Sequence, residues 1–400
     1  MKKKLCIFGG LLLLIAAGVC VLLFWKKPLP PVTARLVTAT DLHYLSPALT
    51  DHGEYFRLVL ENGDGKAMEH CEEITDAFVE QVISTPPDAL LLSGDLTFNG
   101  ARKSHEALIE KLSKIKEAGI PVLAIPGNHD LENRNAASFQ GDHYTLVDSV
   151  TAAEFSELYS AFGFEDALSR DETSLSYVFQ ITPQLRALMI DVNSPGCGGA
   201  VKEETLRWAE EQLILAARQG SRVVAISHQN LIAHSDLFDF GYAIHNGSKL
   251  LELYEKYGVL CNLSGHMHIQ HTVKSQAGLW DIATSSLLMW PLQYGELSLE
   301  GKTAHYRAIP VESPFSDYAY DYHWQHCAQL TADENGKADP ELGRFFADIN
   351  TAYFSGYITP ELWDDTLYQA LQTEGGFTAQ YLTSIYEDGF QNHREFSFDF

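Results

Sequence analysis

The chain has 400 residues, of which 46% are hydrophobic, and a formal net charge of −25 at pH 7. This apolar content excludes global disorder and allows a sizeable core, in one large domain or two ordinary ones. Five of the 28 Lys and Arg residues lie in the first 27 residues, which contain no Asp or Glu, so the remainder carries 23 basic against 53 acidic residues. A surface this acidic repels polyanions and argues against long nucleic acid as a partner.

The N-terminal segment has the pattern of a membrane anchor. Residues 5–25 are apolar and uncharged, and about 20 such residues span a bilayer core. Three lysines precede this run and two follow it, a bias that keeps the N-terminus cytoplasmic and places the bulk of the chain outside. We therefore predict a single-pass protein of the cell membrane, with a cytoplasmic tail at 1–4, an uncleaved anchor at 5–25 and a linker at 26–32. A cleaved secretory signal, with small residues at 16–18, is the alternative.

Short apolar strands alternate with amphipathic helices over residues 33–312, which is typical of a layered α/β domain. The predicted strands cover residues 34–40, 89–92, 120–126, 176–180, 185–191, 222–226, 259–263 and 279–283, followed by a hairpin of 296–298 and 305–307 turned at Gly301. The predicted helices cover residues 66–84, 101–118, 152–162, 203–218 and 248–257. A loop is expected before the first of these helices, and residues 131–171 form a long, mostly polar insertion.

The composition becomes aromatic and acidic after residue 313. Helical spacing recurs at residues 341–353, 360–372 and 377–386, without a strand pattern between them. We therefore predict that residues 313–400 form a helical C-terminal region packed on the α/β body. Four aromatic residues are expected to pack this region, with lining of a substrate groove as the alternative; they are Tyr318, Tyr320, Tyr322 and Trp324.

Polar side chains directly follow five of the predicted strands. They are Asp41 and His43, Asp95, Asn128 and His129, His228, and His266 and His268. Ligands usually bind at the carboxyl ends of strands in α/β sheets, so we expect these side chains to meet. Gly94, Gly127 and Gly265 stand at three of the ends, where a residue without a Cβ lets the backbone turn. Asp, His and one amide oxygen suit divalent first-row metal ions, and a carboxylate between two half-shells makes a dinuclear centre.

In order, the strand ends carry D-x-H, G-D, G-N-H-D, a single H and G-H-x-H. With these motifs the chain resembles the calcineurin-like metallophosphoesterase family over residues 33–310. The layout is most similar to the class III cyclic-nucleotide phosphodiesterase branch, in a membrane-anchored bacterial type. The resemblance implies a layered βαβ metallophosphoesterase sandwich. One departure is Gln229, which follows His228 where many relatives have a second His; that position is not a ligand position, but substrate contacts there are expected to differ.

The resemblance also implies two divalent metal ions, manganese, iron or zinc, that share Asp95 as a bridge. The implied ligands are, for the first ion, Asp41, His43 and His268 and, for the second, Asn128, His228 and His266. A hydroxide between the ions would attack phosphorus in line, and His129 would contact the phosphate and protonate or stabilise the leaving oxygen. Asp130 would orient His129, with an N-cap of a following helix as its alternative role.

The sequence therefore predicts an extracytoplasmic phosphoesterase that hydrolyses a small phosphodiester or phosphomonoester, such as a nucleotide. Two alternatives stay open. One is a membrane-tethered phosphodiesterase of phospholipids or cell-wall polymers, which the anchor favours. The other is a non-catalytic binding protein that keeps the metals as a structural staple, although such a site has no need of His129. G-x-S-x-G and H-E-x-x-H motifs do not occur, and residues 63–66 lack the spacing of a P-loop and are expected to form a turn before a helix.

Overall fold

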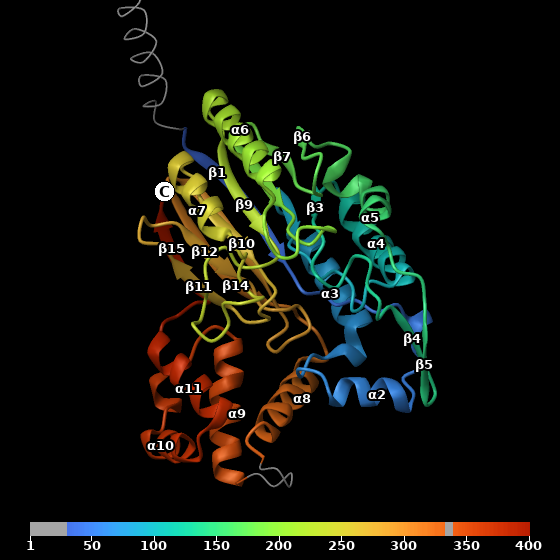
Figure 1. Cartoon of the computed structure of the whole chain (residues 1–400), viewed down its shortest axis with the longest axis vertical. Helices are drawn as coiled ribbons and strands as arrows, with labels where there is room; N and C mark the ends of the chain where they lie inside the picture. The colour runs from blue at the N-terminus through green and yellow to red at the C-terminus, as the bar shows by residue number, and fades with distance from the viewer. Residues whose placement is uncertain (1–29, 333–338) are drawn as a thin grey trace, which may run out of the picture.

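The computed structural model describes residues 30–332 and 339–400 (Figure 1). The predicted cytoplasmic tail at 1–4 and the predicted anchor at 5–25 lie outside these residues. Within the described ranges, every helix is either too short or too polar to cross a bilayer.

Two mixed sheets form the centre of the molecule (Figure 1). The first sheet contains β1 (Val32–Ala39), β2 (Ala89–Leu92), β3 (Val122–Ala124), β13 (Gln293–Gly301), β14 (Thr303–Pro310) and β15 (Glu395–Asp399), in the order β15-β14-β13-β1-β2-β3. The second contains β6 (Ser169–Arg170), β7 (Tyr177–Thr182), β8 (Leu185–Ile190), β9 (Arg222–Ser227), β10 (Cys261–Ser264), β11 (His271–Lys274) and β12 (Trp280–Ala283), in the order β11-β12-β10-β9-β8-β7-β6. The strands predicted before the hairpin are confirmed to within two residues at each end, and the hairpin at Gly301 is β13 and β14.

The strands that lead to the predicted polar ends are parallel within their sheets. β1 runs parallel to β2 and β2 to β3 in the first sheet, while β9 runs parallel to β10 in the second. Parallel strands finish at the same edge of a sheet, and β2 is buried along its whole length, as a strand covered on both faces should be. The carboxyl ends of the five strands are therefore presented together at one end of the two sheets.

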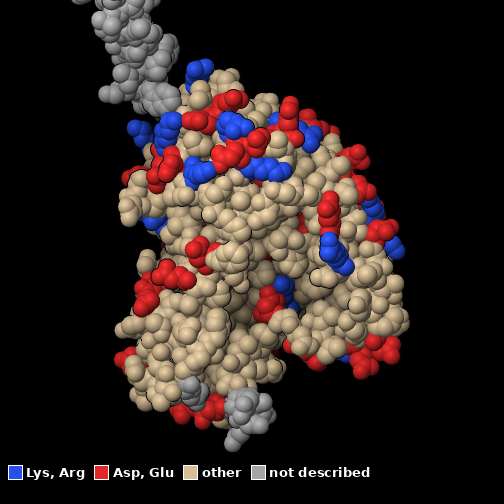
Figure 2. Space-filling view, in the orientation of Figure 1, with Lys and Arg blue, Asp and Glu red and all other residues tan. Residues whose placement is uncertain are grey.

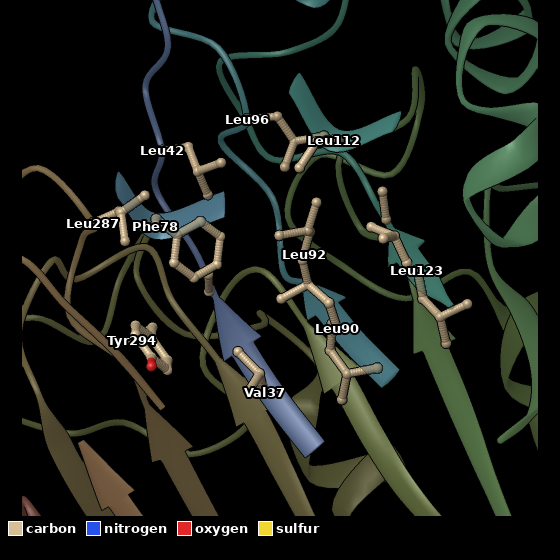
Figure 3. Packing of buried hydrophobic residues seen from close by; sticks show 14 of the residues in the cluster. Val37, Leu42, Phe78, Leu90, Leu92, Leu96, Leu112, Leu123, Leu287 and Tyr294 are labelled. Carbon is tan, nitrogen blue, oxygen red and sulfur yellow. The ribbon is translucent and has the colours of Figure 1, made fainter. Parts of the chain in front are cut away.

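Helices cover the outer faces of both sheets, giving the predicted layered α/β architecture. On the first sheet lie α3 (Cys71–Ser84) and α4 (Arg102–Glu117), and Figure 3 shows Phe78 of α3 gathered with Leu90 and Leu92 of β2. On the second lie α6 (Glu203–Gln219) and α7 (Gly247–Tyr257). Both faces of β8 are covered, because alternate residues of a strand point to opposite faces of the sheet. Ala187 and Met189 face the main core, and Leu188 and Ile190 face α6 and α7.

Several short elements differ from the predictions. The loop predicted before α3 contains α2 (Glu54–Glu61), whose two turns bury Phe56 and Leu60. Two buried residues are too few to give a clear helical period in the sequence. α3 begins at Cys71 rather than at residue 66, because a 3₁₀ turn (Met68–His70) precedes it. The insertion contains a hairpin of β4 (Ala137–Gln140) and β5 (His143–Leu146), and its predicted helix ends earlier, as α5 (Ala152–Leu158), before a π-helical turn (Ser160–Phe164).

The C-terminal region contains more than the three predicted helices. It comprises α8 (Ser316–Gln329), α9 (Pro340–Phe354), a 3₁₀ turn (Pro360–Leu362), α10 (Asp365–Glu374) and α11 (Gly376–Asp388), which share a separate hydrophobic cluster in the lower part of Figure 1. The prediction of a region without strands is wrong, because β15 pairs antiparallel with β14 and extends the first sheet. Phe396 and Phe398 alternate with polar residues in this strand, which has only five residues and therefore a weak sequence signal.

Candidate dinuclear metal centre

The structure brings the predicted polar side chains together at the carboxyl ends of β1, β2, β3, β9 and β10. Three overlapping groups have donor atoms that lie within 4.8 Å of one another: Asp41, His43 and His268; His43, Asp95 and His129; and Asp95, His228 and His266. Asn128 joins the cluster because its Oδ1 lies 2.9 Å from Nε2 of His228. All eight residues singled out at the strand ends, which are separated by up to 227 positions in the sequence, thus converge on one site.

Backbone strain is concentrated in this cluster. Eight non-glycine residues have positive φ among the residues that the structure describes, and five of them are cluster members: Asp41, His43, Asp95, His266 and His268, with φ between 40° and 69°. The left-handed region costs an L-residue roughly 1–2 kcal/mol. Strain of this kind persists only where the surroundings impose it, and it gathers at functional sites. Here it turns the side chains at the ends of β1, β2 and β10 toward each other.

The three glycines at the strand ends serve two different purposes. Gly94 has a φ of 97°, so it supplies the predicted turn. At Gly127 a Cβ would lie 2.2 Å from Oδ1 of Asp95, and at Gly265 it would lie 1.9 Å from Oγ1 of Thr40. The prediction of a turn is therefore right for Gly94. Gly127 and Gly265 are required for another reason: residues of a neighbouring strand end lie so close to their backbone that a Cβ would not fit.

The first half of the centre consists of Asp41, His43 and His268. Nε2 of His43 lies 3.0 Å from Nε2 of His268, and Nε2 of His268 lies 3.3 Å from Oδ1 of Asp41. That Oδ1 atom is buried without a hydrogen-bond partner within the described residues, while Oδ2 accepts from the backbone N–H of His266 at 2.8 Å. Two imidazole nitrogens and one carboxylate oxygen therefore face a common point.

The second half consists of Asp95, Asn128, His228 and His266. Nε2 of His228 lies 3.4 Å from Oδ2 of Asp95 and 3.2 Å from Nδ1 of His266. Oδ2 of Asp95 also lies 3.9 Å from Nε2 of His43, which belongs to the first half. Asp95 thus stands between the halves, at the position that a bridging carboxylate occupies.

The outer nitrogens of three histidines are held by hydrogen-bond acceptors, which turns their inner nitrogens into the cluster. Each outer nitrogen faces a group that only accepts hydrogen bonds, so it carries a proton, and the inner nitrogen is the one that would bind a metal ion. The pairs are His228 Nδ1 with the carbonyl of Ser93 at 2.9 Å, His266 Nε2 with the carbonyl of Gly241 at 2.9 Å, and His268 Nδ1 with the carboxylate of Asp64 at 2.8 Å. Metal-ligating histidines are held in this way, and the mixed N/O donor set fits a pair of divalent first-row cations.

The electrostatics of the cluster also call for cations. Asp41 and Asp95 are at most 1% exposed. Burial alone would raise their pKa values, but the adjacent imidazoles, His268 for Asp41 and His228 for Asp95, lower both well below the usual range. Positive charge beside them therefore keeps both buried carboxylates ionised, and the ionised carboxylate is the form that binds a metal ion.

His129 differs from the other histidines of the cluster in its exposure. Its side chain is 39% exposed, whereas those of His43 and His228 are fully buried. Nδ1 of His129 donates to the carbonyl of Phe98 at 2.7 Å, and its backbone N–H donates to Oδ1 of Asp95 at 2.8 Å. The ring is thus fixed with its Nε2 atom 3.9 Å from Oδ2 of Asp95, and His129 lines the cavity over the cluster.

Asp130 contacts backbone N–H groups, and neither the ring of His129 nor a following helix. Its carboxylate accepts from the backbone N–H groups of Gly127 at 2.8 Å, Leu96 at 3.0 Å and Thr97 at 2.9 Å, and so ties together the loops that follow β2 and β3. The carbonyl of Phe98, rather than Asp130, orients His129, and the described residues after Asp130 form turns instead of a helix. Burial and the charge of Asp95 raise the pKa of Asp130 to about 6.

Sequence reasoning missed the groups that hold the ligands in place. Asp64 lies in the turn at residues 63–66, which was set aside because it is no P-loop, yet it binds His268. The carbonyls of Ser93 and Gly241 carry no signal in the sequence, because every residue has one. Gln229, the departure from the family pattern, exchanges hydrogen bonds of 2.8 and 3.0 Å with Asn193.

A cavity of about 660 Å³ opens over the cluster, with Asp95, Asn128 and His129 in its lining. The C-terminal helices form its opposite wall. Figure 2 shows the face hollowed where these helices meet the α/β body. Of the four aromatic residues predicted to pack the C-terminal region, Trp324 donates to Asp348 within it, Tyr318 and Tyr322 donate to Glu69 and the carbonyl of Leu60 in the α/β body, and Tyr320 is exposed; the cavity lining includes none of the four.

Comparison with known proteins agrees with this geometry. The sequence model of the calcineurin-like phosphoesterase family matches residues 34–270. The DNA double-strand break repair protein Mre11 of Methanopyrus kandleri is 40% identical over 68 residues, covering 16% of this chain and 15% of that protein. A probable cyclic nucleotide phosphodiesterase of Vesicomyosocius okutanii is 46% identical over 96 residues, covering 22% of this chain and 40% of that protein. The structure of a dimetal phosphatase from Danio rerio superposes with a TM-score of 0.51 at 13% identity, covering 71% of this chain and 98% of that one.

These relationships differ in what they establish. The chain spans less than half the length of the curated relatives that it matches, and the likeness to the Danio rerio structure shows the fold alone. The family match covers more than half of the chain and takes in all five strand ends. The chain therefore belongs to the calcineurin-like phosphoesterase family, whose members are hydrolases of phosphoester bonds.

Proposed function

We propose that the chain is a dinuclear metal-dependent phosphoesterase that hydrolyses a small phosphodiester or phosphomonoester outside the cytoplasm. The observation that carries this proposal is that seven candidate ligand side chains converge at the strand ends together with a further imidazole, His129, which is 39% exposed and lines the cavity. A site that only stored metal or stapled the fold would have no use for that imidazole. The non-catalytic alternative is therefore the weaker one.

The ligand assignment follows the two halves of the cluster. One cation would be held by Asp41, His43 and His268 and the other by Asn128, His228 and His266, with Asp95 reaching both. When bound, two divalent cations neutralise phosphate charge and lower the pKa of a water molecule, which supplies a nucleophile near neutral pH.

The residues of the chain position the substrate and move the proton. Asp95 accepts the backbone N–H of His129 at 2.8 Å, so the turn that carries the imidazole is fixed to the bridging carboxylate. With Nδ1 donating to the carbonyl of Phe98, Nε2 of His129 is the atom that donates a proton to the departing ester oxygen. A positioned general acid of this kind contributes roughly 10²–10⁴-fold to the rate.

The choice of substrate rests on three supports. Two curated relatives are named as probable cyclic nucleotide phosphodiesterases, which favours a phosphodiester. The excess of acidic residues disfavours a long polyanion. An anchor at residues 5–25, as the sequence predicts, would put the catalytic domain on the outer side of the membrane, where an extracytoplasmic substrate is accessible.

The test is hydrolysis of bis-p-nitrophenyl phosphate and p-nitrophenyl phosphate by the full-length chain loaded with manganese. We expect turnover that chelator abolishes, and we expect His129→Ala to lower kcat by roughly 10²–10⁴-fold while the protein retains two metal ions per chain. Wild-type protein that holds two metal ions and hydrolyses neither ester would contradict the proposal, and so would full activity of His129→Ala.

A further inference from the structure

The cavity over the candidate metal centre has two chemically different ends. The end at the strand termini is polar and includes Asp95, Asn128 and His129. The far end is formed by the C-terminal helices and the loop that follows β9, and we call it the apolar chamber. Its lining includes Phe238, Ile269, Leu330, Phe346, Tyr353 and Phe377. A ligand whose phosphate lies at the metal centre would therefore extend into an apolar environment.

Each helix of the chamber lines the cavity with residues from one of its faces. On α9 the lining residues are Phe346, Asn350, Tyr353 and Phe354, which fall on one helical face because they are spaced by four, three and one. Lining residues of α8 and α11 recur at similar intervals. The C-terminal region, which the family match leaves out, thus supplies a wall of the cavity over the cluster.

Some polar atoms within this wall are paired inside it, whereas Nδ1 of His323, which also lines the cavity, is buried without a hydrogen-bond partner among the described residues. The hydroxyl of Tyr381 donates to Oδ1 of Asn350 at 2.6 Å, and Nδ2 of Asn350 donates to Sγ of Cys327 at 3.0 Å. The lining contains no Lys or Arg, and Nζ of the nearby Lys66 is paired with Asp64 at 2.9 Å. A second phosphate or another anionic group would meet no arginine or lysine partner in the chamber.

The mouth of the chamber is apolar as well. Phe377 is 63% exposed and Leu330 is 51% exposed, and Phe377 stacks on Tyr381 with an interplanar angle of 9°. In Figure 2 the atoms around the hollow are mostly neither acidic nor basic. Exposed apolar side chains gathered at a concave site mark binding surfaces, and a cavity of about 660 Å³ has the size of a small-molecule site.

We propose that the apolar chamber binds the hydrocarbon chain of an amphiphilic phosphoester whose phosphate lies at the metal centre. This inference rests on the proposed phosphoesterase function and names its substrate class. Hydrolysis breaks one P–O bond, with water supplying oxygen to phosphorus and a proton to the departing alcohol. A flexible chain fits better than a single planar ring, because the lining comes from three helices and a loop and surrounds the space on several sides.

The test measures binding, so that it does not depend on turnover. The manganese-loaded full-length chain is titrated calorimetrically with ethyl-, butyl-, hexyl- and octylphosphonic acid. We expect the affinity to rise about fourfold for each methylene that enters the chamber, the factor typical of apolar burial. Leu330→Ala and Phe377→Ala should reduce the ratio of octyl to ethyl affinity. The matched control is Leu146→Ala, since Leu146 is 62% exposed on the distant β5 strand, and this variant should retain the wild-type ratio.

The outcomes separate this inference from the function on which it rests. Equal affinity for ethyl- and octylphosphonic acid would overturn the chamber proposal even if simple esters are hydrolysed. Tighter binding of phenylphosphonic acid than of octylphosphonic acid would overturn the assignment of a chain in favour of a ring. Binding that rises with chain length, in a protein that hydrolyses no ester, would support the chamber and overturn the phosphoesterase function.

Discussion

Two clusters of His and Asp with metal-ligand spacing occur in the part of the chain that the structure describes, and they are built differently. One is the metal centre at the strand ends. The other joins His271, Asp388 and His393, and we call it the clasp. At the metal centre the outer nitrogens of His228, His266 and His268 face acceptors, so their inner nitrogens converge. In the clasp the backbone N–H of Thr272 donates to Nδ1 of His393 at 3.2 Å, so Nε2 carries the proton and donates to Asp388 at 3.0 Å.

From this difference we infer that the outer partner of an imidazole, as well as residue type and spacing, decides whether a cluster binds metal. The clasp joins the C-terminal end of α11 to β11, because Asp388 accepts a hydrogen bond from His393 and its Oδ1 lies 3.1 Å from Nε2 of His271. At the metal centre, protons on the outer nitrogens bind outer acceptors, and the inner nitrogens are the ones that would bind cations.

The largest effect is expected from Asp95→Asn, which removes the charge that both halves of the metal centre share. A neutral amide at this position cannot offset the charge of two cations. Metal affinity and kcat should therefore fall by more than the roughly 10–100-fold that is typical when an outer hydrogen-bond partner is lost. The measurement is metal content after dialysis, together with ester hydrolysis. Asp388→Asn is the matched change in the clasp and should retain two metal ions and full activity. Equal losses in both variants would erase the distinction between the clusters.

A smaller effect is expected from Asp64→Asn. This substitution replaces the carboxylate that holds Nδ1 of His268, and loss of such an outer partner weakens metal binding roughly 10–100-fold. Metal affinity is measured by competition with a chelator of known strength. Asp142→Asn is the control, since its side chain is 84% exposed on the β4–β5 hairpin. Unchanged affinity in Asp64→Asn would show that the outer partner does not set the tautomer of His268.

The clasp is expected to affect stability rather than catalysis. Breaking a buried hydrogen-bonded group costs about 1–3 kcal/mol, so Asp388→Asn should lower the free energy of unfolding by that amount at pH 7. Urea denaturation, followed by far-UV circular dichroism, measures the change. A variant as stable as the wild type would mean that the clasp contributes nothing to the docking of α11.

The smallest effect is the pH dependence that the clasp confers. Burial lowers the pKa of His271 to about 4, below the value of 6.5 for an unperturbed His. The unfolded chain therefore binds a proton that the folded chain does not, and this contribution is complete above pH 6.5 and is lost as the pH falls through about 4. Between pH 6.5 and 4.5 the wild type should lose roughly 2 kcal/mol more than His271→Gln. Parallel losses in the two proteins would contradict this.

The sequence predicted the metal centre well because its motifs are local. Each ligand stands within a few residues of a strand that can be recognised by its apolar run, and parallel strands carry their ends to one edge of a sheet. Asp64 and the carbonyl of Phe98 could not be predicted in the same way, since their roles depend on loops that meet only in the folded chain. The contacts of Asp130 could not be predicted either, because its carboxylate accepts from backbone N–H groups of the loops that follow β2 and β3 rather than contacting the ring of His129.

The C-terminal region was the least predictable part of the fold. Its helices were partly found from their period, but β15 was not, because five residues give a weak alternation and its partner β14 is about 90 residues earlier. The chamber forms because the apolar faces of three helices line one cavity. Helical periodicity identifies the apolar face of a helix but does not show what that face packs against.

The most direct test of this account is anomalous X-ray diffraction from crystals of the manganese-loaded chain. We predict two anomalous peaks, one beside Asp41, His43 and His268 and one beside Asn128, His228 and His266, with no peak at His271, Asp388 and His393. A peak in the clasp, or the absence of either peak at the strand ends, would contradict the claim that outer hydrogen-bond partners distinguish the two clusters.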